Sequence, residues 1–252
     1  MRRFASLLPL VLLAAGAAHG QTLSGRPPTE WIVDPDKKCK LANAFPSAAE
    51  SITWSGDCKD GYAEGKGVAQ WYKSKKISQK KYEGEMHGGF MNGQGKFTFA
   101  NGDVFDGQFK DGSLDGRGSA RWFNKNHYEG EWKNGYPSGN GTYTWASGNR
   151  YTGQWAEGKQ NGEGDFRFAN GNHYVGAFKD GLMDGQGKFT WSDGNVYTGE
   201  FHNDQPNGKG TVRLYAVAVS HTGVFKDGCM KDGDQMIAIN QSVMDCELKL
   251  SK

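Results

Sequence analysis

Aromatic residues and glycines alternate with polar residues along most of this chain, in a pattern that returns every 23 positions. Each copy has an aromatic residue, a glycine two positions later and a second aromatic residue two positions after that. The six clearest copies begin at Tyr82, Phe105, Tyr128, Tyr151, Tyr174 and Tyr197. Weaker copies begin at Trp54 and His221. Alternation with a period of two is typical of strands with one buried face and one polar face, so the pattern predicts strands in tandem.

Each copy divides into two alternating runs with a turn signal between them. In the copy that begins at Tyr128, the first run ends at Trp132 and the second runs from Gly141 to Trp145. Asn134 and Gly135 lie between the runs, and such pairs accept the positive φ angles of tight hairpin turns. The sequence therefore predicts that one repeat is one β-hairpin.

Aliphatic side chains are too few to form the core of such hairpins. Between Tyr82 and Asp204 the Leu, Ile and Val residues are Val104, Leu114, Val175, Leu182 and Val196. Glycines leave bare main chain, and we expect the aromatic rings of the neighbouring hairpin to lie on it. Because a lone hairpin is marginally stable, each one needs its neighbours and the two ends need caps. The predicted fold is all-β: an elongated, single-layer, solenoid-like antiparallel sheet of stacked hairpins with capped ends.

The two ends of the chain differ from the repeats. Residues 1–20 have a basic start at Arg2 and Arg3, an apolar run from Leu7 to Ala18 and small residues before Gln21, which is typical of a signal peptide. We therefore expect an exported protein, periplasmic or secreted, and no later segment is apolar enough to span a membrane. The expected division is a signal peptide at 1–20, an N-terminal cap at 21–53, a repeat array at 54–233 and a C-terminal cap at 234–252.

Four cysteines lie in two pairs at the two ends of the array, and an even number in an exported chain favours disulfide bonds. Four cysteines allow three pairings. The sequence favours Cys39 with Cys58 and Cys229 with Cys246, because the other pairings would join opposite ends of an elongated body.

The full pattern, Y-x-G-x-[WF]-x-x-G-x-x-x-G-x-G, resembles the MORN repeat (Membrane Occupation and Recognition Nexus) over about residues 54–233. It departs from the motif at Asp204, which replaces a glycine, and at Asp232 and Asp234, which indicates that the array ends there. The resemblance implies a non-enzymatic scaffold that binds proteins or phospholipids, and it allows a homodimer.

The charge balance and the positions of the histidines and acidic residues argue against nucleic-acid binding, catalysis and metal binding. Without residues 1–20 the chain has 28 Lys and Arg against 28 Asp and Glu, so no global basic field favours nucleic acid. We interpret the five later histidines as structural, and the acidic residues, of which most lie in turns, as turn formers. No metal or cofactor is expected. These histidines are His87, His127, His173, His202 and His221.

One local cluster of charge is a candidate binding site. Five lysines lie in the stretch where the first two copies are separated by 28 residues instead of 23: Lys73, Lys75, Lys76, Lys80 and Lys81. We expect an enlarged turn that either binds an anionic lipid or glycan or is merely solvated. The predicted function is an exported scaffold that binds a protein or an envelope surface. The alternative is a lipid- or carbohydrate-binding module that uses exposed aromatics or this Lys73–Lys81 turn.

Overall fold

The computed structural model describes residues 30–43, 50–73, 76–239 and 243–250. The predicted signal peptide, 1–20, lies outside the described residues. The chain forms two compact units. Among the described residues, the N-terminal unit comprises 30–43, 50–73, 76–146 and 156–158, and the C-terminal unit comprises 147–155, 159–239 and 243–250.

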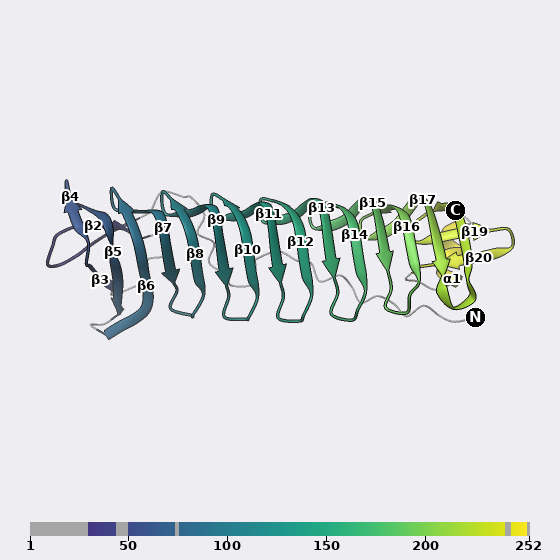
Figure 1. Ribbon diagram of the computed structural model, residues 1–252, viewed down its shortest axis with the longest axis horizontal. Coiled ribbons are helices and arrows are strands. Elements are labelled where there is room, and N and C mark those ends of the chain that lie inside the picture. The colour runs from purple at the N-terminus through teal and green to yellow at the C-terminus, as the bar shows by residue number, and fades with distance from the viewer. Residues whose placement is uncertain (1–29, 44–49, 74–75, 240–242, 251–252) are drawn as a thin grey trace. The chain divides into compact units, whose positions relative to one another are not determined.

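The N-terminal unit consists of antiparallel strands that pair in chain order (Figure 1). A short segment before the repeats, β1 and β2, pairs with itself, and β4 pairs with the start of β5. The strands are β1 (Trp31–Val33), β2 (Lys40–Ala42), β3 (Glu50–Trp54), β4 (Asp57–Lys59), β5 (Tyr62–Lys73), β6 (Lys76–His87), β7 (Phe90–Thr98), β8 (Val104–Lys110), β9 (Ser113–Arg121), β10 (His127–Lys133) and β11 (Tyr136–Thr144).

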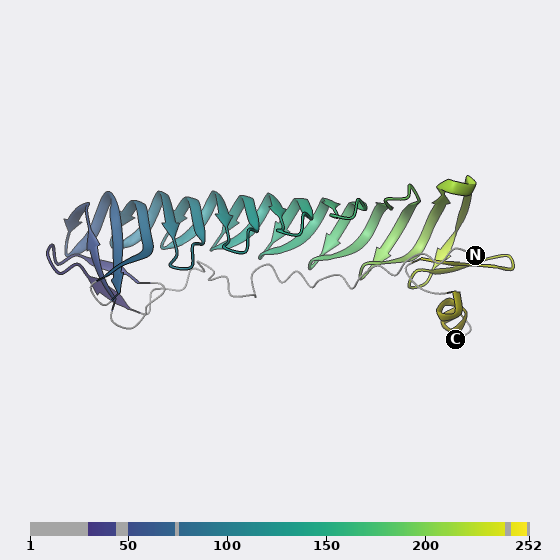
Figure 2. The same ribbon diagram turned by 90° about the horizontal axis from the view of Figure 1, so that it is seen from below.

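The C-terminal unit repeats this arrangement, and β13 to β18 pair antiparallel in chain order. A separate hairpin, β19 and β20, follows, and α1 packs against it (Figure 2). The elements are β12 (Arg150–Ala156), β13 (Lys159–Arg167), β14 (His173–Lys179), β15 (Leu182–Thr190), β16 (Val196–His202), β17 (Gln205–Leu214), a 3₁₀ turn (Tyr215–Val217), β18 (Val219–Phe225), β19 (Cys229–Asp232), β20 (Gln235–Ala238) and α1 (Val243–Leu250). The prediction of an all-β fold of stacked antiparallel hairpins is confirmed.

The turns inside the hairpins have the predicted conformation. Asn134 and Gly135 have φ angles of 49° and 80°, and Asp180 and Gly181 have 51° and 91°. Both central residues of a type I′ turn need such positive angles. The amide of each turn glycine also donates to a carbonyl of the preceding hairpin, as Gly135 does to Leu114 (2.8 Å). The turns therefore join successive hairpins as well as the two strands of one hairpin.

The core is made of aromatic rings on glycines, but each ring lies on its own hairpin. A Cβ atom placed on Gly141 would come within 2.5 Å of Cζ of Tyr128, the tyrosine of the same repeat. The Tyr128 hydroxyl donates to the carbonyl of Glu131 (2.9 Å). Tyr82, Tyr151, Tyr174 and Tyr197 are placed in the same way. The expectation that the ring comes from the neighbouring hairpin is wrong for the glycine contact, because the tyrosine reaches its own glycine pair.

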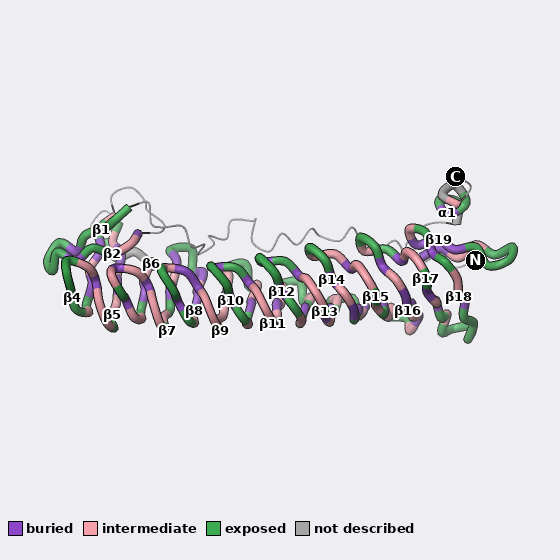
Figure 3. Tube along the Cα trace, turned by 90° about the horizontal axis from the view of Figure 1, so that it is seen from above, coloured by how far each residue is buried: buried purple, intermediate pink, exposed green. Residues whose placement is uncertain are grey.

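Ring–ring contacts then connect neighbouring hairpins. In the C-terminal unit Tyr174 meets Phe178 of its own repeat at a centroid distance of 5.1 Å and Phe201 of the next at 5.0 Å, both edge to face. The same alternation continues through Tyr197 to Phe225. Edge-to-face packing at this distance is favourable beyond the area it buries, so the rings form a continuous core along the unit. Figure 3 shows buried positions recurring along the strands.

A second connection runs through the turns between repeats. In the five copies that begin at Phe105, Tyr128, Tyr151, Tyr174 and Tyr197, Asn or Asp stands two residues before the first aromatic residue, and its side-chain oxygen accepts a hydrogen bond from a backbone amide of the next inter-repeat turn. Asn172 Oδ1 accepts from Ser192 (3.0 Å), and Asn195 Oδ1 accepts from Tyr215 (2.9 Å). Asp103, Asn126 and Asn149 do the same. A buried polar side chain is thus satisfied and ties neighbouring hairpins together.

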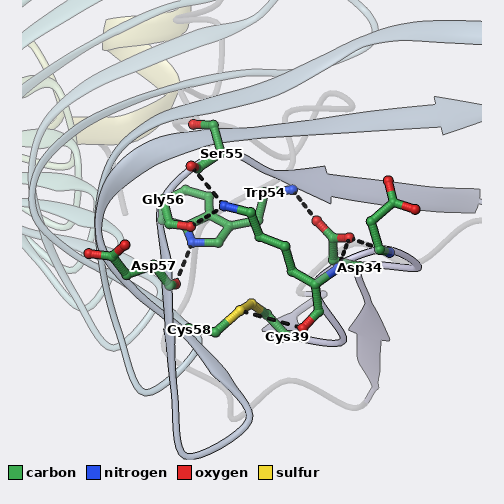
Figure 4. The surroundings of a disulfide bond; sticks show 9 residues. Asp34, Cys39, Trp54, Ser55, Gly56, Asp57 and Cys58 are labelled. Atoms are coloured by element: carbon green, nitrogen blue, oxygen red, sulfur yellow. Dashed lines mark hydrogen bonds between the residues drawn. A yellow bond between two sulfur atoms is a disulfide. The ribbon is translucent and has the colours of Figure 1, made fainter.

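The N-terminal end of the array is closed by a disulfide and a buried carboxylate (Figure 4). The Cα atoms of Cys39 and Cys58 are 5.7 Å apart in this disulfide pair. Asp34 accepts hydrogen bonds from the amides of Lys37 (3.0 Å) and Trp54 (2.6 Å). Burial raises the pKa of Asp34, but these backbone hydrogen bonds outweigh it and hold the pKa below its ordinary value. The cap is therefore fixed to the first repeat.

The C-terminal end is closed differently. Cys229 and Cys246 form the second disulfide pair, with Cα atoms 5.3 Å apart, and it joins β19 to α1. Met230 contacts Gly223, the glycine that a tyrosine covers in the regular copies. The His221 ring instead bonds through Nδ1 to a carboxylate oxygen of Asp232 (2.7 Å).

Candidate binding surface

The lysine-rich stretch is an extended hairpin and not an enlarged turn. Strands β5 and β6 have 12 residues each, whereas the first strands of the later repeats have seven and the second strands mostly nine. Lys73 and Lys76 pair with each other at the end of these strands, and both are exposed. Lys75 lies outside the described residues. The extra residues therefore lengthen the ladder, because strand pairing satisfies backbone groups that a loop would leave to solvent.

Two of the five lysines are not available as a free basic patch. Lys80 is 5% exposed, and its Nζ lies 3.2 Å from Glu50 Oε2 in a buried ion pair. Lys81 is half-buried and pairs with Glu83 at 2.9 Å. The expectation of five exposed lysines is therefore wrong at Lys80, and the accessible charge among the described residues of this stretch is at Lys73 and Lys76.

A half-exposed aromatic cluster lies on the N-terminal unit, which sequence reasoning missed. Trp31 meets Tyr62 edge to face at 5.1 Å and Phe90 at 5.4 Å. Trp31 is 42% exposed and the nearby β1 residue Val33 is 44% exposed. The ammonium of Lys40 lies 5.6 Å from the centre of the Tyr62 ring. An amphipathic aromatic surface with an adjacent cation is typical of sites that bind protein.

The backbone explains why these rings meet. Strand β2 lies across two hairpin turns: the Lys40 amide donates to Gly61 (2.9 Å) and the Ala42 amide donates to Gly89 (2.8 Å). Tyr62 and Phe90 each follow one of those turns, and β1 pairs with β2. The sequence did contain one signal of this cluster. Tyr62 and Phe90 each directly follow a turn glycine, a position that is not among the buried aromatic and glycine positions of the repeat.

Most other aromatic rings are buried in the core or lie against inter-repeat turns. Phe123 is 78% exposed and Tyr215 is 68% exposed. Each lies near the glycine of the preceding inter-repeat turn: a Cβ atom on Gly194 would be 3.2 Å from Cγ of Tyr215, and one on Gly102 would be 3.7 Å from Cδ2 of Phe123. Each of these two rings therefore covers the inter-repeat turn next to it.

Histidine side chains lie against acidic side chains on the surface. His202 Nδ1 lies 2.8 Å from Asp184, and His87 Nδ1 lies 2.9 Å from Glu64. Of the acidic turn residues, Asp115 pairs with Lys133 at 3.1 Å. Across the described parts of the chain, no group of three or more His, Cys, Asp or Glu side chains is arranged to hold a metal ion.

In several hairpins a glutamate or glutamine side chain lies over the point where the strand register shifts. Strand pairing shifts by a bulge between Gly130 and Trp132, and Gly139 on the partner strand has φ 62°. The Glu131 carboxylate accepts the Asn140 amide there (3.1 Å). Gln154 and Glu200 do the same in their repeats. These polar side chains are therefore structural.

The fold defines a tandem β-hairpin repeat protein with a repeated aromatic core. The MORN repeat model matches residues 82–104, 105–127, 128–150, 151–173, 174–196 and 197–213. The chain belongs to the MORN repeat family, whose repeats are non-catalytic scaffolds that bind proteins or membranes.

Comparison with other proteins adds little to this family assignment. No curated protein matches the chain. Among solved structures, the chain is similar to the TCP domain of SAS-4 (dCPAP) of Drosophila melanogaster, solved in complex with a proline-rich motif of Ana2 (dSTIL). The two share 9% identity over 73% of this chain and 97% of that one, with a TM-score of 0.39. Among the helices that the structure describes, none has the length and apolar character needed to cross a membrane.

Proposed function

We propose that this chain is an exported, non-enzymatic MORN scaffold that binds a protein partner through the aromatic cluster of Trp31, Tyr62 and Phe90. Export is supported by the signal-like residues 1–20 and by two cysteine pairs at disulfide distance. The family supports a binding role without catalysis.

The observation that carries the proposed site is that Trp31 remains 42% exposed although it already touches two other rings. Large rings left accessible beside a cation are enriched among the residues that dominate protein interfaces. The aromatic residues that begin the repeats are buried, so they are not free to serve a partner.

A pull-down from an envelope extract tests this proposal. The mature chain is immobilised and compared with Trp31→Ala and with the control Phe123→Ala, which removes a more exposed ring elsewhere. The proposal expects one specific polypeptide that is retained by wild type and by the control and lost with Trp31→Ala. Equal retention by both variants would contradict it.

A second candidate is binding to an anionic envelope surface at the end of the β5–β6 hairpin. The observation that favours it is the exposed pair Lys73 and Lys76, carried beyond the length of the other hairpins. Each lysine near an anionic surface contributes about 1 kcal/mol to binding. Sedimentation with vesicles containing anionic lipid is expected to weaken in the double variant Lys73→Gln, Lys76→Gln and in high salt. Binding that neither change alters would exclude this candidate.

A further inference from the structure

A buried lysine, a carboxylate and an amide meet where the N-terminal segment joins the first hairpin. Lys80 Nζ lies 3.2 Å from Oδ1 of Asn43 and 3.2 Å from Oε2 of Glu50. The Asn43 amide nitrogen lies 3.4 Å from the same Glu50 oxygen. Glu50 therefore touches both nitrogen atoms, and the lysine amine lies against the amide group of Asn43.

Water has little access to this cluster. Lys80 is 5% exposed and Asn43 is 4% exposed, and the exposed fraction of the Glu50 side chain is 8%. The Lys80 ammonium lies 4.9 Å from the centre of the Trp71 ring, which is itself 2% exposed. A buried ion pair of this kind has a high desolvation cost, which transfer of the lysine proton to the carboxylate would remove.

We propose that Lys80 and Asn43 react with each other to form an intramolecular isopeptide bond, with Glu50 carrying the proton between them. The geometry supplies a nucleophile, an acyl carbon and an acid–base group in one buried site. Such groups fit the general requirements of acyl transfer, in which a positioned base activates the amine and the resulting acid protonates the leaving group.

The reaction balances without another reactant. Glu50 accepts a proton from the Lys80 ammonium, and the neutral Nζ attacks Cγ of Asn43 to form a new C–N bond. The tetrahedral adduct then breaks the bond from Cγ to Nδ2. Glu50 returns its proton to Nδ2, which also takes the second proton of the attacking nitrogen, so that Nδ2 leaves as an ammonium ion. The carboxylate is regenerated, and no electron is gained or lost overall.

The ionisation of Lys80 agrees with this role. Burial lowers the pKa of Lys80, and the opposing attraction of Glu50 does not restore it to its ordinary value. The amine is therefore easier to deprotonate than a surface lysine. Lys66, which pairs with Glu85 at 3.4 Å with 82% of its side chain exposed, has no such environment.

The bond would have a mechanical consequence for the cap. Asn43 ends the segment that carries β1, β2 and Cys39, and Lys80 lies in β6, 37 residues further along the chain. A covalent link between them would hold the N-terminal cap on the first long hairpin independently of the Cys39–Cys58 disulfide. This would preserve the cap under reducing conditions.

Peptide mapping of the full wild-type chain tests the proposal. The chain is reduced, alkylated and digested with trypsin, which does not cleave after an acylated lysine. We expect a branched peptide that joins the segment with Asn43 to the segment with Lys80 and is lighter than the two by one ammonia. The branched peptide is decisive, because an amino-terminal glutamine and Asn–Gly pairs also lose ammonia and change the intact mass.

Matched variants separate the reaction from simple packing. Glu50→Gln keeps the size of the side chain but removes the acid–base group, and we expect the branched peptide to form about 100-fold more slowly or less. Asn43→Ala is expected to abolish it, and Lys66→Arg is expected to leave it unchanged. Linear peptides containing unmodified Asn43 and Lys80 from folded wild-type protein would overturn the proposal, as would an unchanged rate in Glu50→Gln.

Discussion

The regular repeats and the two end copies cover the recurring glycines of the hairpin with different side chains. In the regular copies a tyrosine covers its own glycine pair and donates to the carbonyl three residues later, as Tyr151 does to Gln154 (2.8 Å). In the first copy Trp54 covers Gly56 and Gly67 and donates from Nε1 to Asp57 (2.8 Å). In the first copy and in the tyrosine copies, a flat ring with a hydrogen-bond donor at its far edge therefore occupies this position.

The Phe105 copy and the last copy show what happens without that donor. Phenylalanine has no hydroxyl, and in the Phe105 copy the side chain nearest to Gly118 is Leu114, at 3.3 Å from an added Cβ. In the last copy the His221 ring is hydrogen-bonded to Asp232, and Met230 covers Gly223. In the Phe105 copy a leucine of the same hairpin therefore contacts the glycine, and in the last copy a methionine of β19 takes the place of the ring.

We expect the largest difference in the free energy of unfolding between two variants: one that removes the first ring of an interior copy and one that removes the first ring of the last copy. Tyr174 is fully buried between two other rings, so Tyr174→Ala should lower the free energy of unfolding by about 4 kcal/mol. His221→Ala should cost about 1 kcal/mol, mainly through the lost hydrogen bond to Asp232. Urea denaturation followed by circular dichroism measures both. An equal loss of unfolding free energy in the two variants would contradict the distinction between interior and end copies.

Gly141 of the Tyr128 copy and Gly118 of the Phe105 copy occupy the same repeat position, so substituting each by alanine compares a tyrosine copy with the phenylalanine copy. An alanine methyl at Gly141 would overlap the Tyr128 ring, whereas at Gly118 it would meet the Asp106 carbonyl at 3.0 Å and Leu114 at 3.3 Å. Gly141→Ala should cost about 3 kcal/mol and Gly118→Ala about 1 kcal/mol, because only the first forces a rigid ring to move. The same denaturation experiment applies, and a larger cost at Gly118 would contradict the ring placement.

Much of the fold could be predicted because its signals are local. The positive φ angles at Asn134-Gly135 and the alternation through Tyr128 and Trp132 follow from side-chain size and turn chemistry. The source of the ring on each glycine pair could not be predicted, since alternation places the rings of both neighbouring hairpins on the same face. The bulge at Gly139, which the Glu131 carboxylate covers, also depends on strand register and not on local pattern.

The candidate site was less predictable than the fold. Counting charges identified the lysine stretch but could not show that Glu50, far away in the sequence, buries Lys80. The Trp31 cluster forms because β2 crosses the turns before Tyr62 and Phe90, which is a tertiary contact. The proposed pairing of the cysteines rested on their positions around the array, and the structure has the same two pairs.

The smallest effects are expected from removing only the donors. Tyr151→Phe and Trp54→Phe each keep a ring but lose the hydrogen bond to a carbonyl, to Gln154 and Asp57 respectively. Each should lower the free energy of unfolding by about 1 kcal/mol for the lost bond, and Trp54→Phe somewhat more because its ring is also smaller. Thermal unfolding of the two variants measures this. No change in Tyr151→Phe would show that the hydroxyl is not needed.

Spectrophotometric titration of the tyrosines tests the central claim, that these rings are buried on bare main chain. Burial raises the pKa of Tyr143 to about 12 and also raises the pKa of Tyr82, Tyr151, Tyr174 and Tyr197 above the ordinary value of 10.0. Because the folded pKa is the higher one, this stabilisation is complete below pH 10 and is lost as the pH rises through the folded pKa. We expect these phenols to ionise only together with loss of the β-sheet circular dichroism signal. Reversible ionisation of these five tyrosines near pH 10 with the sheet intact would contradict the account.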